Sequence, residues 1–476
     1  MVTAAKTPRN AICFWNGIAL DANKRDHSFA APAVSATPEQ GGPTLSARAL
    51  ALIHLAMHDA WFGAQKKPAY GLYLPGFALK PSPKPLDPSA AAGAAARTML
   101  DELYRRQAGD TAAAWTAFEG AYPTPDAAVA YGVRVASALL GFRGVDVPPP
   151  GSYAPPPCSQ GRDFHRVDPE NPKQGYYGVT HGGIRPFVIT KIRDLDDPRR
   201  FEPSVFPNAL AQVRAVGGAP GQPGTTRSAD ETVAALFWAF DGANGLGTPP
   251  RLYNQILGCI ADSQKNSPDD DARLFALANT AMADGGISAW SNKYRLAFWR
   301  PVLGVREEDA STGPCGKPRR NLGPCVDPFW KPLGAPSTNT DRKPFTPNFP
   351  AYPSGHATFG SAAFQSARRF YAAKNPKKYP WGRREADSLA FEFVSGELDG
   401  MAEQPLGSVR PQVLRSFAGL WDALRENALS RLWLGVHWVF DSFGDPDYND
   451  NVGGVPLGLG VADEIADSGL RAIQEP

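Results

Sequence analysis

Cysteine is scarce in this sequence, and its scarcity excludes one large class of folds. Only five cysteines occur in 476 residues, too few for a fold held together by a framework of disulfides. Cys315 and Cys325 lie in one loop rich in proline and glycine, where they could pair or remain two separate thiols. Neither has a second cysteine at C-x-x-C spacing, so a structural zinc site is disfavoured.

The chain also lacks an excess of charge of either sign and any long apolar run. It carries 49 Lys and Arg against 47 Asp and Glu, a formal net charge of +2. Nucleic-acid-binding domains usually show a basic excess, so we expect neither a nucleic acid nor an anionic membrane surface as partner. No stretch approaches the roughly 18 apolar residues of a membrane-spanning helix. Residues 1–17 contain no apolar segment of signal-peptide length, so the cytoplasm is the default expectation and export by another route stays open.

Proline, in contrast, is abundant, with 47 residues that gather in loops. Because proline lacks an amide hydrogen and clashes with the preceding helical turn, residues 142–205 and 304–350 are predicted to be long connections. Elsewhere apolar residues recur at helical spacing, as in residues 44–65 behind a Thr/Ser start. Strand-like alternation is scarce, and residues 384–398 and 412–443 are also predicted to be helical. The pattern predicts an all-α fold of packed helices.

The first stretch that indicates chemistry is KYRLAFWRP. Lys293 and Arg300 are two helical turns apart, so both cations are predicted to share one face of a helix. Pro301 is expected to end that helix and leave Arg300 near its terminus. Two cations beside Trp290 and Trp299 are unusual for a solvated surface. The plain alternative is an amphipathic helix whose charged ends reach water.

The second stretch is FPAYPSGHATFG, which places a hydroxyl, a bare backbone amide and an imidazole at Ser354, Gly355 and His356. The residues that follow are predicted to form a helix, and a helix N-terminus is an anion-binding site. Glycine lets the backbone approach a ligand closely, and histidine can move protons near neutral pH. The alternative is a turn that happens to contain a histidine.

The third stretch is SRLWLGVHWVFD. Ser430, His437 and Asp441 are seven and four residues apart and are predicted to lie on nearly one stripe of a helix. Asp441 can orient His437 through a hydrogen bond, as carboxylates do for imidazoles that bind metals. Arg431 lies beside the stripe, and its long fork can reach across it.

Together the three stretches provide the groups that bind a PO₄-shaped anion. Three permanent cations in an apolar setting are very costly unless a multiply charged anion neutralises them. The sequence therefore predicts a site for phosphate or a phosphate analogue, built from Lys293, Arg300, Ser354, Gly355, His356, Arg431 and His437.

The motifs KxxxxxxRP, PSGH and SRxxxxxHxxxD are all complete here. In this respect the chain resembles the superfamily of type-2 phosphatidic-acid phosphatases, bacterial acid phosphatases and vanadium-dependent haloperoxidases. SARALALIHLAMHDAWF, FWAFDGANGLGTPPRLYNQI and GGVPLGLGVADEI extend a resemblance to the fungal vanadium chloroperoxidases over most of the chain. The chain is shorter than they are, chiefly between Asp441 and Gly453. The resemblance implies two helical bundles, residues 1–225 and 226–476, with the anion site in the second.

The resemblance also implies a role for each site residue. His437 would be the covalent ligand of a vanadate cofactor, and His356 the acid–base group that takes a proton from hydrogen peroxide. Asp241 would pair with Arg431, and Asp441 would support His437 from behind. The groups expected to hold the vanadate oxygens are Lys293, Arg300, Ser354, the Gly355 amide and Arg431, and Lys293 would also polarise bound peroxide.

The implied reaction is the oxidation of a halide by hydrogen peroxide to hypohalous acid, which then halogenates a small organic nucleophile. Phe349 matches a position beside the halide site that is Phe in chloroperoxidases and His in many algal bromoperoxidases. Trp290 and Trp299 are expected in the same pocket. The rival function is an acid phosphatase with a phosphohistidine at His437, which the motifs alone do not exclude. The halide, the organic substrate and the oligomeric state are left open.

Overall fold

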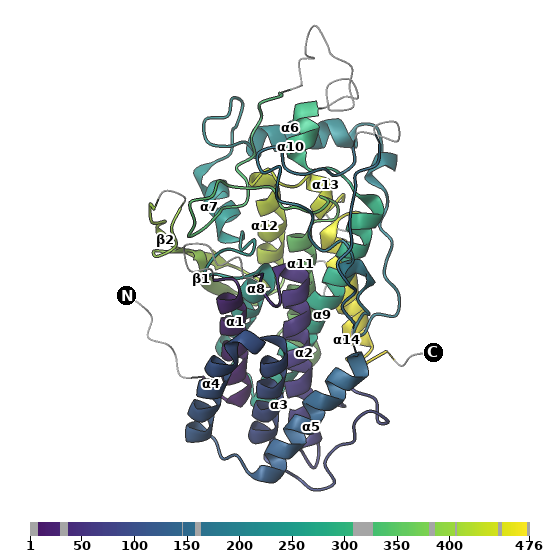
Figure 1. Ribbon diagram of the computed structural model, residues 1–476, viewed down its shortest axis with the longest axis vertical. Helices are drawn as coiled ribbons and strands as arrows, with labels where there is room; N and C mark the ends of the chain where they lie inside the picture. The colour runs from purple at the N-terminus through teal and green to yellow at the C-terminus, as the bar shows by residue number, and fades with distance from the viewer. Residues whose placement is uncertain are drawn as a thin grey trace.

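The computed structural model describes residues 8–28, 37–144, 146–157, 163–307, 327–379, 386–404, 407–445 and 450–473. Within these ranges the chain is mostly helical and forms one elongated body (Figure 1). The N-terminal helices α3, α4 and α5 lie at one end, and α6, α10 and α13 lie near the other. The expectation of an all-α fold is confirmed, apart from one small sheet.

The N-terminal helices are α1 (Ala11–Asp26), α2 (Gly42–Gly63), α3 (Pro88–Leu103), α4 (Ala108–Ala121) and α5 (Asp126–Arg143). Side-chain caps begin two of them: Asn10 accepts a hydrogen bond from the Cys13 amide, and Asp87 accepts one from the Ala90 amide. The alanine-rich α3 packs against α2 and α5. These helices approach closely, because a Cβ added at Gly132 would lie 2.1 Å from the carbonyl oxygen of Ala91.

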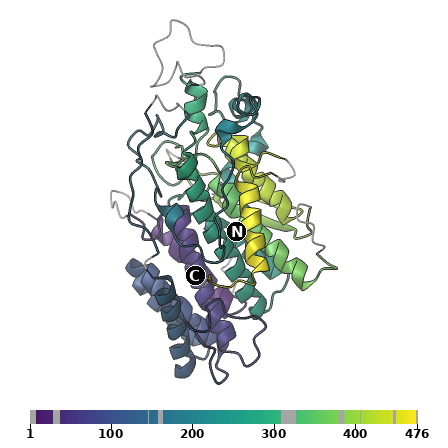
Figure 2. The same cartoon turned by 90° about the vertical axis from the view of Figure 1, so that its right-hand side faces the viewer.

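The remaining helices build the other half of the molecule, in the order α6 (Val205–Val216), α7 (Ala229–Phe237), α8 (Pro249–Ser263), α9 (Pro268–Leu296), α10 (Pro301–Glu307), α11 (Gly355–Lys374), α12 (Leu420–Trp433), α13 (Val439–Ser442) and α14 (Gly454–Asp467). The 29-residue α9 begins with a capping box between Ser267 and Asp270. It is buried on most of its surface and contacts α2, α11 and α14 (Figure 2). A helix that is buried all round is the core of its bundle.

A two-stranded antiparallel sheet occupies part of the chain that the sequence predicted to be helical. β1 (Phe391–Asp399) pairs with β2 (Gln412–Phe417), and Phe391 lies opposite Phe417. The helical prediction for residues 384–398 and 412–417 is therefore wrong for the residues described there, 386–398 and 412–417. The reason is local: side chains in β2 alternate between exposed and half-buried, the period of a strand, and aromatic and β-branched residues favour strands.

The long connections are largely as predicted. Between α5 and α6 the described residues contain only short 3-10 turns, His181–Gly183 and Pro198–Arg200. Cys315 and Cys325 lie outside the described residues. The division of the chain at residue 225 stays a prediction, and α2 lies directly against α9 across it.

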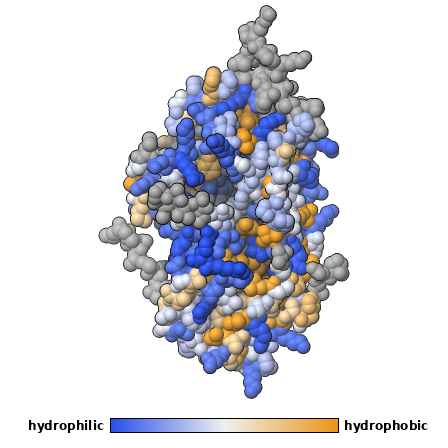
Figure 3. All heavy atoms as spheres, in the orientation of Figure 1, coloured by the Kyte–Doolittle hydropathy of each residue, from blue (hydrophilic) through white to orange (hydrophobic). Residues whose placement is uncertain are grey.

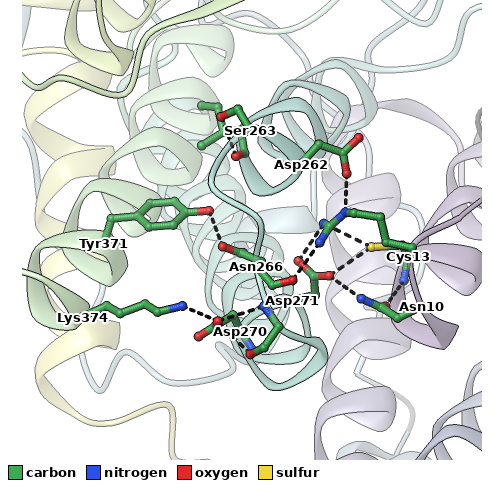
Figure 4. Close-up of polar contacts among 12 residues, drawn as sticks. Asn10, Cys13, Asp262, Ser263, Asn266, Asp270, Asp271, Tyr371 and Lys374 are labelled. Carbon is green, nitrogen blue, oxygen red and sulfur yellow. Dashed lines mark hydrogen bonds and ion pairs between the residues drawn. The ribbon is translucent and has the colours of Figure 1, made fainter.

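A polar cluster joins α1 to the start of α9 (Figure 4). Asp271 accepts hydrogen bonds from the Asn10 side chain, at 2.7 Å, and from the Cys13 thiol, at 3.1 Å. On the other side, Asp270 pairs with Lys374 at the end of α11. The acidic first turn of α9 thus connects an N-terminal helix with α11.

The surface in Figure 3 mixes polar and apolar residues, with apolar patches most frequent in its lower part. Among the residues that the structure describes, no helix combines the length and the apolar character needed to cross a membrane.

Candidate active site

The C-terminus of α9 separates Lys293, which lies in the helix, from Arg300, which follows it. The helix ends at Leu296, and Ala297 adopts a left-handed conformation with φ 48°. The prediction that both cations share one helical face is therefore wrong, because the helix ends before Arg300, and Pro301 begins α10 instead of ending α9. Both side chains are nonetheless buried, at 0% and 1% exposure.

Lys293 and Arg300 both donate hydrogen bonds to the backbone of the segment 349–351. Lys293 Nζ donates to the carbonyl oxygens of Pro350, at 2.7 Å, and Ala351, at 2.9 Å. Arg300 Nε donates to the carbonyl oxygen of Phe349 at 3.0 Å. The tertiary fold thus brings the two cations together although no helix does.

The PSGH segment forms the N-terminus of α11, as the sequence predicted. Ser354 is the N-cap residue, and its hydroxyl oxygen accepts a hydrogen bond from the Ala357 amide. An accepting hydroxyl keeps its own proton for donation to an anion. The backbone is close to its neighbours here, because a Cβ added at Gly355 would lie 3.3 Å from the ring of Trp290.

His437 lies in the connection between α12 and α13. Since α12 ends at Trp433 and α13 begins at Val439, the prediction that Ser430, His437 and Asp441 share one helical stripe is wrong. Gly435, with φ 70°, allows the turn and lies against the backbone of residue 217. The expected partnership survives, because His437 Nδ1 lies 2.7 Å from Asp441 Oδ2.

The contact with Asp441 fixes which imidazole nitrogen of His437 faces the cations. Nη1 of Arg300 can only donate, so Nε2 accepts with its lone pair and Nδ1 carries the proton that faces Asp441. Nε2 lies 2.9 Å from Nη1 of Arg300. Asp441 is itself held, since Oδ2 also accepts from the Trp438 amide at 3.0 Å. The Nε2 lone pair thus accepts from Arg300, and vanadium bound at Nε2 would take the place of that guanidinium.

Arg431 and His356 are both anchored to one turn, residues 239–241. Arg431 Nη2 donates to both carboxylate oxygens of Asp241, at 2.8 and 3.0 Å. His356 Nε2 lies 2.6 Å from the carbonyl oxygen of Ala239. The structure thus contains the pair of Asp241 with Arg431 that the resemblance implied. The carbonyl of Ala239 is a contact that no side-chain motif could reveal.

The electrostatics of the site show the cost of its positive charge. Burial lowers the pKa of Lys293 well below its usual range, and Arg300 lowers it further. Burial likewise lowers the pKa of Arg300 to about 9. It lowers the pKa values of His356 and His437 well below the ordinary value, with neighbouring arginines acting in the same direction. An anion in the site would oppose these shifts, because it favours the charged form of each group.

Several buried donors of the site have no hydrogen-bond partner among the described residues. They are Nη2 of Arg300 and Nε and Nη1 of Arg431. Buried N–H groups of charged side chains are rarely left unpaired, because the loss of hydration is uncompensated. Together with the hydroxyl of Ser354 and the lone pair of His437, these donors have the chemistry to hold an oxyanion such as vanadate.

An aromatic wall lies beside the cations. The rings of Trp290 and Phe349 are 4.8 Å apart, and Lys293 Nζ and the Arg300 guanidinium each lie 5.0 Å from the Phe349 ring. Trp299 is placed differently: its ring stacks on Phe206 of α6, and within the described ranges no ring contact joins it to Trp290 or Phe349.

Sequence reasoning missed two side chains near this wall, both from the proline-rich connection. The Tyr177 ring lies 6.0 Å from Phe349 and 6.1 Å from Trp290. His165 is buried, and both its ring nitrogens lack a partner among the described residues. Burial and the Arg300 cation lower its pKa well below the ordinary value. Neither residue belongs to a periodic or motif pattern, so no signal in the sequence could have identified it.

Known proteins resemble this chain over most of its length. Residues 3–122 match the vanadium chloroperoxidase N-terminal domain, and residues 273–468 match the second helical-bundle domain of the same family. The vanadium chloroperoxidase of Curvularia inaequalis is 33% identical, over 97% of this chain and 90% of that protein.

Solved structures of similar shape agree with this comparison at the level of the fold. A bacterial vanadium-dependent iodoperoxidase superposes with a TM-score of 0.67 at 20% identity, over 95% of this chain and 96% of that one. An apo-type bacterial vanadium-dependent chloroperoxidase gives 0.62 at 15% identity, over 91% and 96%. On the matching domains and the full-length relative, this chain belongs to the vanadium chloroperoxidase family.

Proposed function

We propose that this protein is a vanadate-dependent haloperoxidase that oxidises halide with hydrogen peroxide to hypohalous acid. The observation that carries the proposal is the set of buried, unpaired donors on Arg300 and Arg431 beside the Nε2 lone pair of His437. Membership of the vanadium chloroperoxidase family supports the same function and the same cofactor.

The donor set of the site suits vanadate. His437 Nε2 would bind the vanadium, and the unpaired N–H groups of Arg300 and Arg431 would hold its oxygens, with the Ser354 hydroxyl and the Gly355 amide at the start of α11. Vanadate, when bound, supplies a Lewis-acidic vanadium(V) that makes hydrogen peroxide reactive towards halide without changing its own oxidation state.

Lys293 has one donor left for this chemistry. Its ammonium carries three N–H groups, and two are used by the carbonyls of Pro350 and Ala351. The third can donate to an oxygen of vanadate or of peroxide. Because the two carbonyl contacts fix the ammonium, Lys293 would polarise the peroxide from a constant position.

His356 is arranged to accept a proton. The Ala239 carbonyl can only accept, so Nε2 of His356 carries the hydrogen and Nδ1 holds the lone pair. Burial lowers the pKa of His356, which keeps the ring neutral near pH 7. We therefore assign Nδ1 as the atom that takes a proton from hydrogen peroxide and returns it when hypohalous acid leaves.

Trp290 and Phe349 would form the halide pocket, since their rings pack against each other beside Lys293. A halide there would lie near a cation and against apolar ring edges. Because Phe349 matches the residue found in chloroperoxidases, we expect chloride to be a substrate as well as bromide. The hypohalous acid would then halogenate small organic nucleophiles with little control by the protein.

A parallel assay of purified apo-protein tests the proposal. One sample receives orthovanadate, hydrogen peroxide, chloride or bromide, and monochlorodimedone; the other receives p-nitrophenyl phosphate without vanadate. Halogenation that depends on vanadate is expected. Rapid phosphate-ester hydrolysis that vanadate only inhibits, without halogenation, would instead establish an acid phosphatase that uses His437 as its nucleophile.

Two substitutions test the assigned roles. His437→Ala should abolish vanadate retention and halogenation together, whereas His356→Ala should keep vanadate and lower turnover by roughly 10²–10⁴-fold, the usual contribution of a general base. Arg425→Ala is the control, because Arg425 is exposed on the same helix as Arg431. Full activity in His437→Ala would show that the ligand assignment is wrong.

A further inference from the structure

The turn formed by residues 239–241 is the support of two site residues at once. Its first residue offers a carbonyl to His356, and its last offers a carboxylate to Arg431. Its middle residue, Phe240, adopts a left-handed conformation with φ 44°. Residues other than glycine rarely hold this conformation unless their surroundings impose it. Something outside the turn must therefore hold it in place.

Glu397 of β1 makes that contact. Its Oε1 accepts a hydrogen bond from the Phe240 amide at 3.2 Å. Its Oε2 accepts from the Thr338 hydroxyl at 2.5 Å and pairs with Arg410. Glu397 is 0% exposed, so its carboxylate is held from three directions inside the protein.

A second side chain of β1 forms a hydrogen bond to the backbone just before the turn. The Ser395 hydroxyl donates to the carbonyl oxygen of Phe237, the last residue of α7, at 2.7 Å. Ser395 and Glu397 are two residues apart in β1, both are fully buried, and both contact the segment 237–240. The small sheet therefore holds both ends of the segment that connects α7 to Asp241.

We propose that Glu397 is a positioning residue for the oxyanion site: by holding the Phe240 amide, it keeps the Ala239 carbonyl on His356 and the Asp241 carboxylate on Arg431. This inference rests on the proposed function, since it concerns the same site. Glu397 would touch neither vanadate nor substrate. It acts on His356 by fixing which nitrogen carries the proton, and on Arg431 by fixing where its unpaired N–H groups point.

The pair of Glu397 with Arg410 is better explained by geometry than by stability. Arg410 is 3% exposed, and removing two charges from water offsets most of their mutual attraction. A buried ion pair is therefore a weak way to stabilise a fold. It is an effective way to fix a carboxylate in one orientation, and this orientation is what the Phe240 amide requires.

The test uses Glu397→Ala and Glu397→Gln in the full chain, with Asp146→Asn as the matched control. Asp146 is also a buried carboxylate, paired with Arg143 far along the chain from the site. Orthovanadate affinity of the apo-protein is measured by calorimetry, together with thermal stability and the pH profile of kcat. Glu397→Ala should weaken vanadate binding at least tenfold and shift the pH profile. Glu397→Gln should do so less, because an amide oxygen can still accept from Phe240.

The control separates positioning from general loss of stability. Asp146→Asn should lower the melting temperature and leave vanadate affinity and the pH profile unchanged. The proposal is overturned if Glu397→Ala lowers stability to the same degree with affinity and pH profile both intact. Should Glu397→Ala fail to fold, Thr338→Val removes one hydroxyl from Glu397 Oε2 and must weaken vanadate binding in the same direction.

Failure of the proposed function would be recognised separately. If the wild-type protein binds vanadate but does not oxidise halide, the haloperoxidase assignment is refuted. The ratio of vanadate affinities of wild type and Glu397→Ala would then still measure positioning. Wild-type protein that halogenates, with Glu397→Ala binding vanadate equally well, would refute only the positioning role.

Discussion

Two buried charge clusters, one in the first half of the chain and one in the second, satisfy their arginines in different ways. Near the end of α5, Asp146 accepts from Arg48 Nε and from Arg143 Nε, each at 2.8 Å. The other donors of Arg143 bond to the carbonyl oxygens of Arg185 and Pro186. Every charged group in this cluster has a partner within the protein.

The candidate active site is built from the same residue type with the opposite result. Arg300 and Arg431 are as deeply buried as Arg143, yet three of their donor groups have no acceptor among the described residues. A closed cluster has no donor left for a ligand. An open cluster keeps unpaired donors and uncompensated positive charge, and an oxyanion ligand would pair with both.

The strongest way to break this comparison is to remove one arginine from each cluster. Arg143→Met should lower the free energy of unfolding by about 3–5 kcal/mol, because it leaves Asp146 buried with fewer partners, and should not change vanadate affinity. Arg300→Met should weaken vanadate binding by about 100-fold, since charge-assisted hydrogen bonds contribute roughly 1.5–3 kcal/mol each. Denaturant unfolding and calorimetry give the two values.

The contrast fails if both variants lose stability equally and neither loses affinity. In that case the unpaired donors of Arg300 would be met by water, and the cluster would be structural after all.

A second prediction concerns the stability that bound orthovanadate should add to the fold. Orthovanadate at 100 times its dissociation constant should raise the free energy of unfolding by about 2.7 kcal/mol, the amount expected for a ligand that binds only the folded state. At the same concentration the gain should fall to about 0.4 kcal/mol in Arg300→Met and stay unchanged in Arg143→Met. A thermal-shift titration measures it, and an equal gain in both variants would mean that vanadate binds elsewhere.

A third prediction extends the comparison to a buried carboxylate with protein partners. Asp284 accepts from the amides of Phe187, Val188 and Ile189, but burial raises its pKa to about 6. The folded protein therefore binds more protons than the unfolded chain between about pH 4 and 6. Its free energy of unfolding should fall by about 3 kcal/mol as the pH rises through this window.

Asp284→Asn should flatten this part of the stability profile, while lowering stability overall because one amide oxygen replaces two carboxylate oxygens. Denaturant midpoints between pH 4 and 7 report the slope. A slope that is identical in the variant would assign the pH dependence to another group.

The smallest predicted effect lies at the aromatic wall beside the open cluster. Phe349→His adds a polar ring next to Lys293 and Arg300. We expect the ratio of chloride to bromide oxidation to fall by about tenfold, equivalent to about 1.4 kcal/mol. Halogenation rates at matched halide concentrations measure the ratio, and Phe206→Leu, which lies against Trp299 outside the wall, should leave it unchanged.

Local patterns in the sequence predicted the helices but not the sheet. Residues 44–65 and the helix after PSGH carry strong 3.6-residue periodicity and form α2 and α11. β2 shows the alternation of a strand, but whether so short a segment becomes a strand also depends on the partner it finds in the fold, here β1. Strand preference is set by such packing context more than by the residues alone.

The residue types of the site were readable, but their arrangement was not. Three motifs identified Lys293, His356 and His437, because few other functions need these groups together. Two of the helical stripes drawn through them were wrong, since α9 ends at Leu296 and α12 ends at Trp433. Contacts made by backbone atoms, such as the Ala239 carbonyl, leave no trace in residue identity.

The anchoring of one arginine at residues 239–241 has a consequence for how the protein matures. Asp241 and Arg431 are 190 residues apart in the chain, and Arg300 and His437 are 137 apart. Contacts between residues so far apart in sequence form only after large loops have closed, so we expect them to form late in folding. Nascent or truncated chains should therefore be unable to capture vanadate, and metal uptake would mark the molecules that have completed assembly.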